Sequence, residues 1–174
     1  MAAPGRGVWY ATRSESRNAP GGARVTASMA LTGTYVPSKQ QWVRDQVAAF
    51  EESDGARANT LRDSGDPIVV ITSVGAKSGN LRKNPVMRVE RDGTYVAIAS
   101  KGGSDDHPEW YFNFLAHPEV ELQDGAEKHL YTVRLVEGEE RTDWWEYAVA
   151  TWPTYGEYQK KTDREIPVFL LERT

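Results

Sequence analysis

The chain has 174 residues, of which 39% are hydrophobic and 26% are charged, a composition typical of one globular domain with its own core. The net charge of -4 and the lack of an arginine-rich stripe or RNA-binding motif argue against nucleic acid, so we expect no nucleic-acid partner. The absence of cysteine excludes disulfides, thiolate metal sites and cysteine nucleophiles, and no apolar run approaches the roughly 20 residues that span a bilayer.

The first 28 residues are dominated by Ala, Gly, Pro, Ser and Arg and show no apolar periodicity. Such a composition predicts disorder, and the lack of a continuous apolar stretch argues against a secretory signal. Met29 leaves open that translation starts there and not at Met1. We therefore expect a flexible extension over residues 1–34 and a single folded domain over 35–174.

A helix is predicted from Ser38, as its cap, to about Ser53, with Gly55 ending it. The apolar residues of this segment recur at helical spacing and should share one broad, buried face. These residues are Trp42, Val43, Val47 and Phe50.

Strands are predicted after this helix, with short helices between and after them. The dipeptides at 92–93 and 124–125 are Asp-Gly, which favours tight hairpins between the flanking strands. The pattern predicts an antiparallel sheet that closes into a barrel with helices packed outside it. The expected strands span 67–74, 84–93, 94–100, 119–125, 128–138 and 166–172, and the expected helices span 107–118, 139–151 and 154–163.

The segment 75–85, GAKSGNLRKNP, follows the first predicted strand and is rich in groups that bind anions. Its two glycines allow successive N–H groups to turn inward, its serine adds a hydroxyl, and Lys77 and Arg82 bring two cations to one loop. The spacing matches neither a Walker loop nor a GxGxxG motif. An ordinary hairpin turn over 78–80 with solvated cations is the alternative.

A second candidate segment lies where another predicted strand ends and a helix begins. Ser100, Lys101 and Gly102 follow this strand, and strand ends and helix N-termini are places where anionic or planar ligands meet backbone donors. The alternative is a flexible loop in which Asp105 or Asp106 caps the helix.

Three aromatic residues near the C-terminus, Trp152, Tyr155 and Tyr158, recur at a three-residue spacing. On a helix they would lie on one side, either as core or as the wall of a pocket, since buried tyrosine hydroxyls need a partner or water. No histidine pair has the spacing of a metal site, so we expect no metal. The three histidines are His107, His117 and His129.

Three segments of the chain, taken together and in order, carry a family resemblance. ITSVGAKSGNLRKNPVMRV, YVAIASKGGSDDHPEWYFNFLAHPEVEL and WPTYGEYQKKTDREIPVFLLE resemble the deazaflavin (F420)-dependent nitroreductase family of mycobacterial and related actinobacterial proteins. The resemblance covers roughly residues 35–172. It implies an α+β, mainly β fold, a split β-barrel like that of the FMN-binding pyridoxamine-phosphate oxidases with flanking helices. It also implies coenzyme F420, an 8-hydroxy-5-deazaflavin, and no metal.

The resemblance also assigns roles to residues of this chain. The residues implied to bind the coenzyme are Lys77, Ser78 and Arg82 at its anionic tail, Asn84, Pro85 and Val86 at its ring, and Ser100, Lys101, Gly102, Trp110 and Asn113 around both. The residues implied to line the substrate site are Trp152, Tyr155 and Tyr158, and those implied to supply a proton are Tyr155, Tyr158 and Ser100, or water. Trp152 stands where the family would place a third tyrosine, which leaves the pocket shape open.

The function implied by the resemblance is hydride transfer from reduced F420 to a quinone, such as menaquinone, or to another electron-poor acceptor, a nitroaromatic or a coumarin-type lactone. Two alternatives stay open: a non-catalytic carrier of F420 or lipid, and a split barrel that binds FMN. We expect a cytoplasmic protein, with peripheral contact at the inner face of the cell membrane as a further possibility. The residues leave a monomer and a homodimer equally open.

Overall fold

The computed structural model describes residues 31–62 and 64–174, so most of the expected extension lies outside the described residues. The helices are α1 (Gln41–Glu52), α2 (Glu109–Ala116), α3 (Gly138–Thr151) and α4 (Thr154–Gln159), with a short 3-10 helix η1 (Lys101–Gly103). The strands are β1 (Ile68–Val74), β2 (Leu81–Met87), β3 (Glu90–Arg91), β4 (Thr94–Ile98), β5 (Glu119–Asp124), β6 (Glu127–Val136) and β7 (Val168–Arg173).

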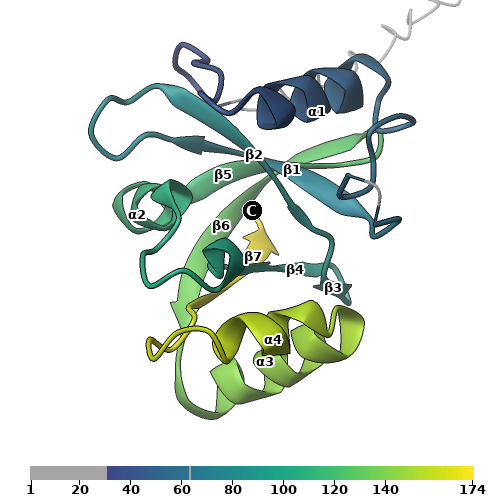
Figure 1. The fold of residues 1–174 in the computed structure, drawn as a ribbon. Helices are drawn as coiled ribbons and strands as arrows, with labels where there is room; N and C mark the ends of the chain where they lie inside the picture. Colours follow the sequence, from purple (N-terminus) through teal and green to yellow (C-terminus); the bar gives the residue numbers. More distant parts are fainter. Residues whose placement is uncertain (1–30, 63) are drawn as a thin grey trace, which may run out of the picture.

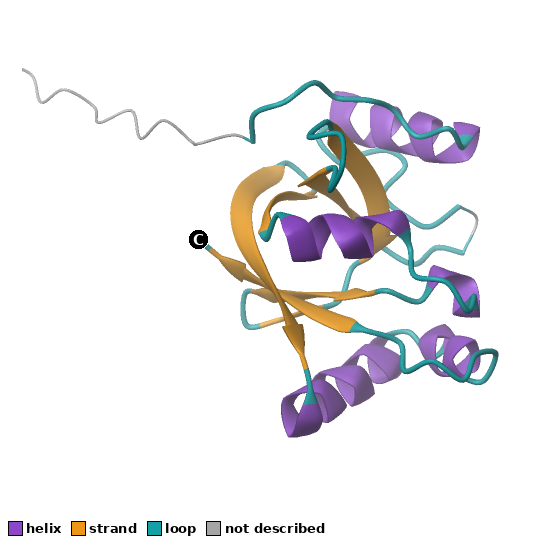
Figure 2. Ribbon diagram, turned by 90° about the vertical axis from the view of Figure 1, so that its left-hand side faces the viewer, coloured by secondary structure: helices purple, strands orange, loops and turns teal. Residues whose placement is uncertain are grey.

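The strands form one antiparallel sheet in the order β2-β1-β5-β6-β7-β4-β3. The two outermost strands, β2 and β3, are separated in the chain by only Arg88 and Val89, so the sheet must curl until its edges approach each other. The backbone N–H of Val96 donates to the carbonyl of Val89 at 2.9 Å and continues the pairing at this closure. Figures 1 and 2 show the resulting barrel with the helices outside it, which confirms the predicted split barrel.

The predicted strand over 84–93 is wrong in one respect, because the structure divides it. β2 begins earlier, at Leu81, and ends at Met87, and β3 pairs with β4 on the other side of the closure. The expected Asp-Gly hairpin is confirmed, since Asp92 and Gly93 have φ angles of 54° and 84°. Positive φ at both central residues is the geometry that a two-residue hairpin needs.

Helix α1 is shorter than predicted, and its buried face contains Val43, Val47 and Phe50 as expected but not Trp42. It begins at Gln41, and the Ser38 hydroxyl accepts from the N–H of Gln40 instead of capping the helix. Trp42 is 37% exposed, and the Arg62 guanidinium lies 4.3 Å from its ring centroid, so the expected burial of Trp42 is wrong. Gln46 is buried instead, because its amide donates to carbonyls of the loop that leads to β1.

Alternate residues of β1 belong to two different hydrophobic clusters. Ile68 and Val70 pack with residues of α1, α3 and α4, whereas Val69 and Ile71 pack with Phe114 of α2 and with the inner residues of β5 and β6. A strand buried on both faces reads as a continuous apolar run, which is why PIVVITSV shows no alternation. One face of β1 is thus buried with α1, α3 and α4, and the other with α2 and the facing strands.

Candidate active site

The strand directions bring the candidate loops to one end of the barrel. Because neighbours in the sheet are antiparallel, β1, β6 and β4 run in the same direction. The loop after β1, residues 75–80, and the loop after β4, residues 99–108, therefore leave the sheet at the same end. The sequence places these loops well apart in the chain, and the topology brings them together.

Asn113 of α2 shapes the loop over 75–80. Its side-chain oxygen accepts from the N–H of Ala76 at 2.9 Å, and its amide donates to the Ser73 hydroxyl at 3.3 Å. Asn113 is only 7% exposed, so this polar side chain is buried together with its partners. A Cβ at Gly75 would lie 2.6 Å from the Ser78 hydroxyl oxygen and 3.2 Å from the Asn80 carbonyl oxygen, so a larger residue there would displace the Ser78 side chain.

The cations of this region fall into two kinds. The Lys83 ammonium pairs with Glu51 of α1 at 2.5 Å, and both side chains are largely buried. Within the described residues, neither Lys77 at the exposed loop tip nor Arg82 on β2 forms an ion pair. An anion that enters this region would therefore meet two cations that are not neutralised by carboxylates.

The register of β2 separates the three residues expected at the coenzyme ring. Asn84 lies opposite Ile71, on the face that packs toward α2, and Val86 lies on the same face. Pro85 lies opposite Val70, on the face that packs toward α1. Neighbouring strand residues point to opposite faces, so only Asn84 and Val86 present their side chains together.

The loop after β4 has an unusual backbone. Lys101, Gly102 and Gly103 all have positive φ, at 45°, 66° and 85°. This conformation is costly for lysine, and such backbone strain tends to occur at functional sites. The Ser100 side chain, just before this turn, is 7% exposed.

Arg164 holds this loop through its backbone carbonyls and was missed by the sequence analysis. Its guanidinium donates to the carbonyls of Ala99, Ser100 and Ser104 at 3.0, 2.9 and 2.8 Å. It also lies 3.1 Å from Nδ1 of His107, which must accept because arginine only donates. Burial, and then the nearby Arg164 charge, lower the pKa of His107. No local pattern signals these partners, which lie about sixty residues away in the chain.

The three aromatic residues cluster, although not on one helix. Trp152 is the C-terminal cap of α3, and Tyr155 and Tyr158 belong to α4, because Pro153 ends the first helix. The Trp152 ring meets the rings of Tyr155 and Tyr158 edge-on, at centroid distances of 4.8 and 5.8 Å. Tyr155 is 4% exposed, and burial raises its pKa, whereas Tyr158 is only partly buried.

Trp110 has mainly packing contacts. Its ring lies 4.9 Å from Phe114 and 6.2 Å from Phe169, measured between centroids. It therefore borders the cluster under α2. The structure brings α2 to the loop over 75–80 through Asn113, and the Trp110 ring supports that placement.

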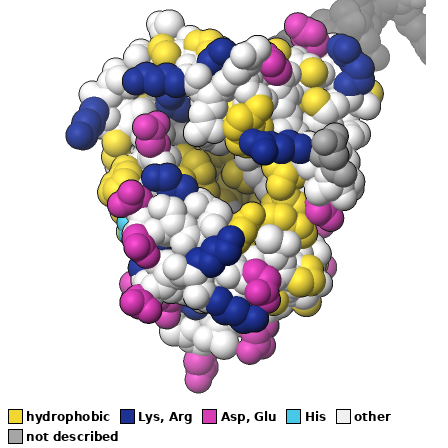
Figure 3. Space-filling model, viewed as in Figure 1, with side chains coloured by type: hydrophobic (Ala, Val, Ile, Leu, Met, Phe, Trp, Pro, Cys, Tyr) yellow, Lys and Arg dark blue, Asp and Glu magenta, His cyan; other side chains and the backbone are white. Residues whose placement is uncertain are grey.

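Figure 3 shows a hollow on the face viewed in Figure 1, between β2 on one side and η1 and α4 on the other. Hydrophobic side chains line its floor, and Lys and Arg side chains lie around its rim. The elements that surround it are those that carry the predicted site residues. An apolar floor with a cationic rim suits a ligand with a flat aromatic ring and an anionic tail.

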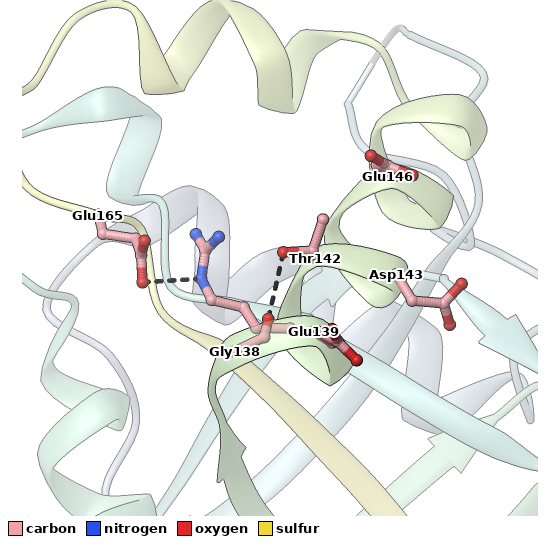
Figure 4. A pocket seen from close by; sticks show the side chains of 7 residues that line it. Gly138, Glu139, Thr142, Asp143, Glu146 and Glu165 are labelled. Carbon is pink, nitrogen blue, oxygen red and sulfur yellow. Dashed lines mark hydrogen bonds and ion pairs between the residues drawn. The ribbon is translucent and has the colours of Figure 1, made fainter.

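A separate cavity of about 570 Å³ lies at the N-terminal end of α3 (Figure 4). Its lining is mostly acidic, with Arg141 Nε 3.2 Å from a carboxylate oxygen of Glu165. None of the predicted site residues lines it. The lining residues are Gly138, Glu139, Arg141, Thr142, Asp143, Glu146 and Glu165.

The described part of the chain lacks two features. Over residues 31–62 and 64–174, no group of three or more His, Asp or Glu side chains is placed to hold a metal ion. In the same ranges, no helix has the length and hydropathy needed to cross a membrane.

Comparisons with known proteins point to one family. Residues 42–173 match the family model described as F420H(2)-dependent quinone reductase. An F420H(2)-dependent quinone reductase of Mycobacterium tuberculosis is 30% identical over 115 residues, which cover 62% of this chain and 74% of that protein.

Solved structures agree with this match. An F420-H2 dependent reductase, FDR-A, is 55% identical and superimposes with a TM-score of 0.58 over 61% of this chain and 94% of its own. A structure described as a domain-swapped dimer is 48% identical, with a TM-score of 0.61 over 78% of this chain and all of its own. Because the family model covers well over half of the residues and the deazaflavin resemblance is thereby confirmed, this chain belongs to the F420H(2)-dependent quinone reductase family.

Proposed function

We propose that this protein binds coenzyme F420 in the hollow between β2, η1 and α4 and uses its reduced form to reduce a quinone. The proposal is supported above all by Lys77 and Arg82, two cations without carboxylate partners among the described residues. The donor set fits the group, since the tail of F420 carries a phosphate and glutamates and its flat ring combines an aromatic face with a polar edge. Cations paired with those anions form charge-assisted hydrogen bonds.

The proposed coenzyme-binding residues contact different parts of F420. Lys77, with Ser78 beside it in the loop, and Arg82 hold the anionic tail. Asn84 and Val86, which share a face of β2, contact the ring. Pro85 supports the ring through the backbone of β2, since its side chain packs toward α1.

The strained turn forms the other side of the hollow. Ser100, Lys101 and Gly102 approach the ring from η1, and Arg164 keeps their backbone in place through the carbonyls before the turn. Asn113 holds the first loop from α2, and Trp110 supports that helix. A site whose loops are fixed by buried hydrogen bonds is preorganised for its ligand.

When bound, reduced F420 supplies a hydride from C5 of its deazaflavin ring. The protein orients the acceptor against the aromatic wall of Trp152, Tyr155 and Tyr158, excludes water and donates a proton to the reduced acceptor. Tyr158 is the better-placed donor, because it is only partly buried, whereas Tyr155 lies in the core at 4% exposure. Ser100 and water are the other candidate donors.

The acceptor class follows from the shape and chemistry of the wall. Aromatic rings that meet edge-on suit a flat, electron-poor ring such as the naphthoquinone of menaquinone, which would bring the protein to the inner face of the membrane. Nitroaromatics and coumarin-type lactones share that chemistry and belong in the same assay. The domain-swapped dimer of a relative makes a homodimer the first assembly to look for by light scattering.

The test is a titration of the purified protein with oxidised and reduced F420, followed by addition of menaquinone to the reduced complex. We expect the absorbance of oxidised F420 to return faster than in a protein-free control. Tight binding without return for any acceptor would favour the carrier alternative. Yellow protein purified from a host without F420, and tight FMN binding with no F420 binding, would favour the FMN alternative.

A further inference from the structure

One hydrogen bond links the α4 side of the hollow to the segment that leads into β1. The indole Nε1–H of Trp152 donates to the Asp66 carboxylate at 3.0 Å, across 86 residues of chain. Trp152 ends α3 next to α4, and Asp66 lies two residues before β1. The bond therefore sets how the aromatic wall stands relative to the β1–β2 hairpin.

The Asp66 end of this bond is anchored by its own backbone. The carbonyl of Asp66 accepts from the N–H of Leu61 at 2.8 Å, and its N–H donates to the Ser64 hydroxyl at 3.1 Å. The next residue, Pro67, accepts at its carbonyl from the N–H of Arg88 at 2.9 Å, which ties the segment to the barrel closure. The carboxylate is thus presented from a fixed position.

At the Trp152 end, a backbone hydrogen bond fixes the main chain, but it does not fix the orientation of the indole ring. The backbone N–H of Trp152 donates to the carbonyl of Ala148 at 2.8 Å, which closes the last turn of α3. The indole has rotatable side-chain torsions, and it meets Tyr155 and Tyr158 edge-on. Whatever fixes the indole plane also fixes the space between these rings.

We propose that Asp66 is a positioning residue for the acceptor: it holds the Trp152 indole so that the aromatic wall selects acceptors by size. This inference rests on the proposed function, since the wall must face the acceptor. Asp66 touches neither coenzyme nor acceptor and acts through Trp152. Without the carboxylate, the indole turns more freely and the wall accepts a wider range of acceptor shapes.

The kinetic test compares two acceptors, menadione and a naphthoquinone with a prenyl tail. In Asp66→Ala, we expect the ratio of their kcat/KM values to shift by about tenfold, the effect of one charge-assisted hydrogen bond, with an unchanged Kd for F420. Asp66→Asn should fall between Asp66→Ala and wild type, because its amide oxygen still accepts from the indole but carries no charge. Asp45→Ala, which removes an exposed carboxylate from α1, is the matched control and should change nothing.

A double-mutant cycle separates positioning from general stability. In a Trp152→Phe background, Asp66→Ala should have no further effect on the acceptor ratio, because the partner indole is gone. A merely structural role would instead lower the melting temperature and weaken F420 binding equally in both backgrounds. That result, or an acceptor ratio in Asp66→Ala equal to that in Asp45→Ala, would overturn the inference.

A second readout does not depend on turnover. In protein labelled with ¹⁵N-tryptophan, the indole N–H peak of Trp152 is the one missing from Trp152→Phe. We expect it to move upfield and to exchange faster with water in Asp66→Ala, and to shift when menadione is added to wild type. A peak unmoved by menadione in a protein that still reduces quinones would overturn this inference and leave the proposed function intact. If the peak moves but the protein has no reductase activity, the result would support acceptor binding at the aromatic wall, which this inference requires. It would overturn the proposed function.

Discussion

At the scale of single residues, two neighbours on β2 make a natural comparison. Arg82 has no ion-pair partner among the described residues, whereas Lys83 pairs with Glu51 on the other face of the strand. We expect Lys77→Ala and Arg82→Ala each to weaken F420 binding by roughly 1.5–3 kcal/mol, measured by titration of the coenzyme absorbance. Lys83→Met is the control: it should lower the free energy of unfolding and leave F420 affinity unchanged. Equal losses in all three variants would mean that only the general positive charge of the region matters.

The proposed proton donor gives a second prediction at this scale. Tyr158→Phe removes a hydroxyl from a partly buried ring and should lower kcat roughly 100-fold while F420 still binds, because proton donation is lost and not the coenzyme site. Tyr155→Phe should lower kcat much less, since Tyr155 lies in the core at 4% exposure. Stopped-flow reoxidation of bound F420 measures both. A normal rate in Tyr158→Phe would indicate that Ser100 or water donates the proton to the reduced acceptor.

At the scale of elements, the contact between η1 and α4 depends on Gly103. A Cβ at Gly103 would lie 2.7 Å from the backbone oxygen of Tyr158, and its φ of 85° already disfavours other residues. Gly102 has a similar φ, of 66°, but no atom within 4 Å of such a Cβ. Gly102→Ala should therefore cost about 1–2 kcal/mol of unfolding free energy, and Gly103→Ala distinctly more. Urea unfolding compares the two variants. Equal losses of unfolding free energy would show that η1 can shift to make room for the Cβ without disturbing α4.

The loop held by Arg164 should respond to acid. The pKa of His107 is lowered below its ordinary value of 6.5, mainly by burial, so the unfolded chain takes up its proton first as the pH falls. The stability that neutral His107 contributes is therefore present above pH 6.5 and lost as the pH drops through its lower folded pKa. Urea unfolding at a series of pH values below 7 should show this loss, and His107→Gln should remove part of it. His117→Gln, at an exposed position after α2, is the control and should keep the wild-type acid response.

At the scale of the whole molecule, four buried or partly buried tyrosines make the stability of the fold sensitive to alkaline pH. Burial raises the pKa of Tyr35, Tyr95, Tyr131 and Tyr155 above the ordinary value of 10. The unfolded chain loses these protons first, so the contribution to stability is fully present below pH 10 and is lost as the pH rises toward the folded values. We expect the unfolding free energy to fall steeply above pH 10. The fall should be shallower in Tyr155→Phe, and an equal fall would show that Tyr155 is ionised in the folded protein.

The architecture follows in large part from local signals. Pro108 and Pro118 bound α2, Asp92 and Gly93 make the hairpin between β3 and β4, and the apolar run before Gly75 forms strand β1, which is buried on both faces. Each of these signals acts within a few residues, so the sequence alone carries it. The strand pattern also predicted the barrel, and the family resemblance, through three spaced segments, added the coenzyme class.

What the sequence by itself determined is therefore the set of helices and strands, the loops that carry the cations and glycines, and the membership in a deazaflavin-dependent family. Only the tertiary structure decided that β2 and β3 separate at the closure, that Lys83 has a carboxylate partner while Arg82 has none among the described residues, that Arg164 holds the turn after β4, and that Asp66 meets Trp152. The physical reason is that these features join residues far apart in the chain. A donor and an acceptor separated by sixty or more residues meet only once the sheet has closed, and no local pattern records which of them will pair.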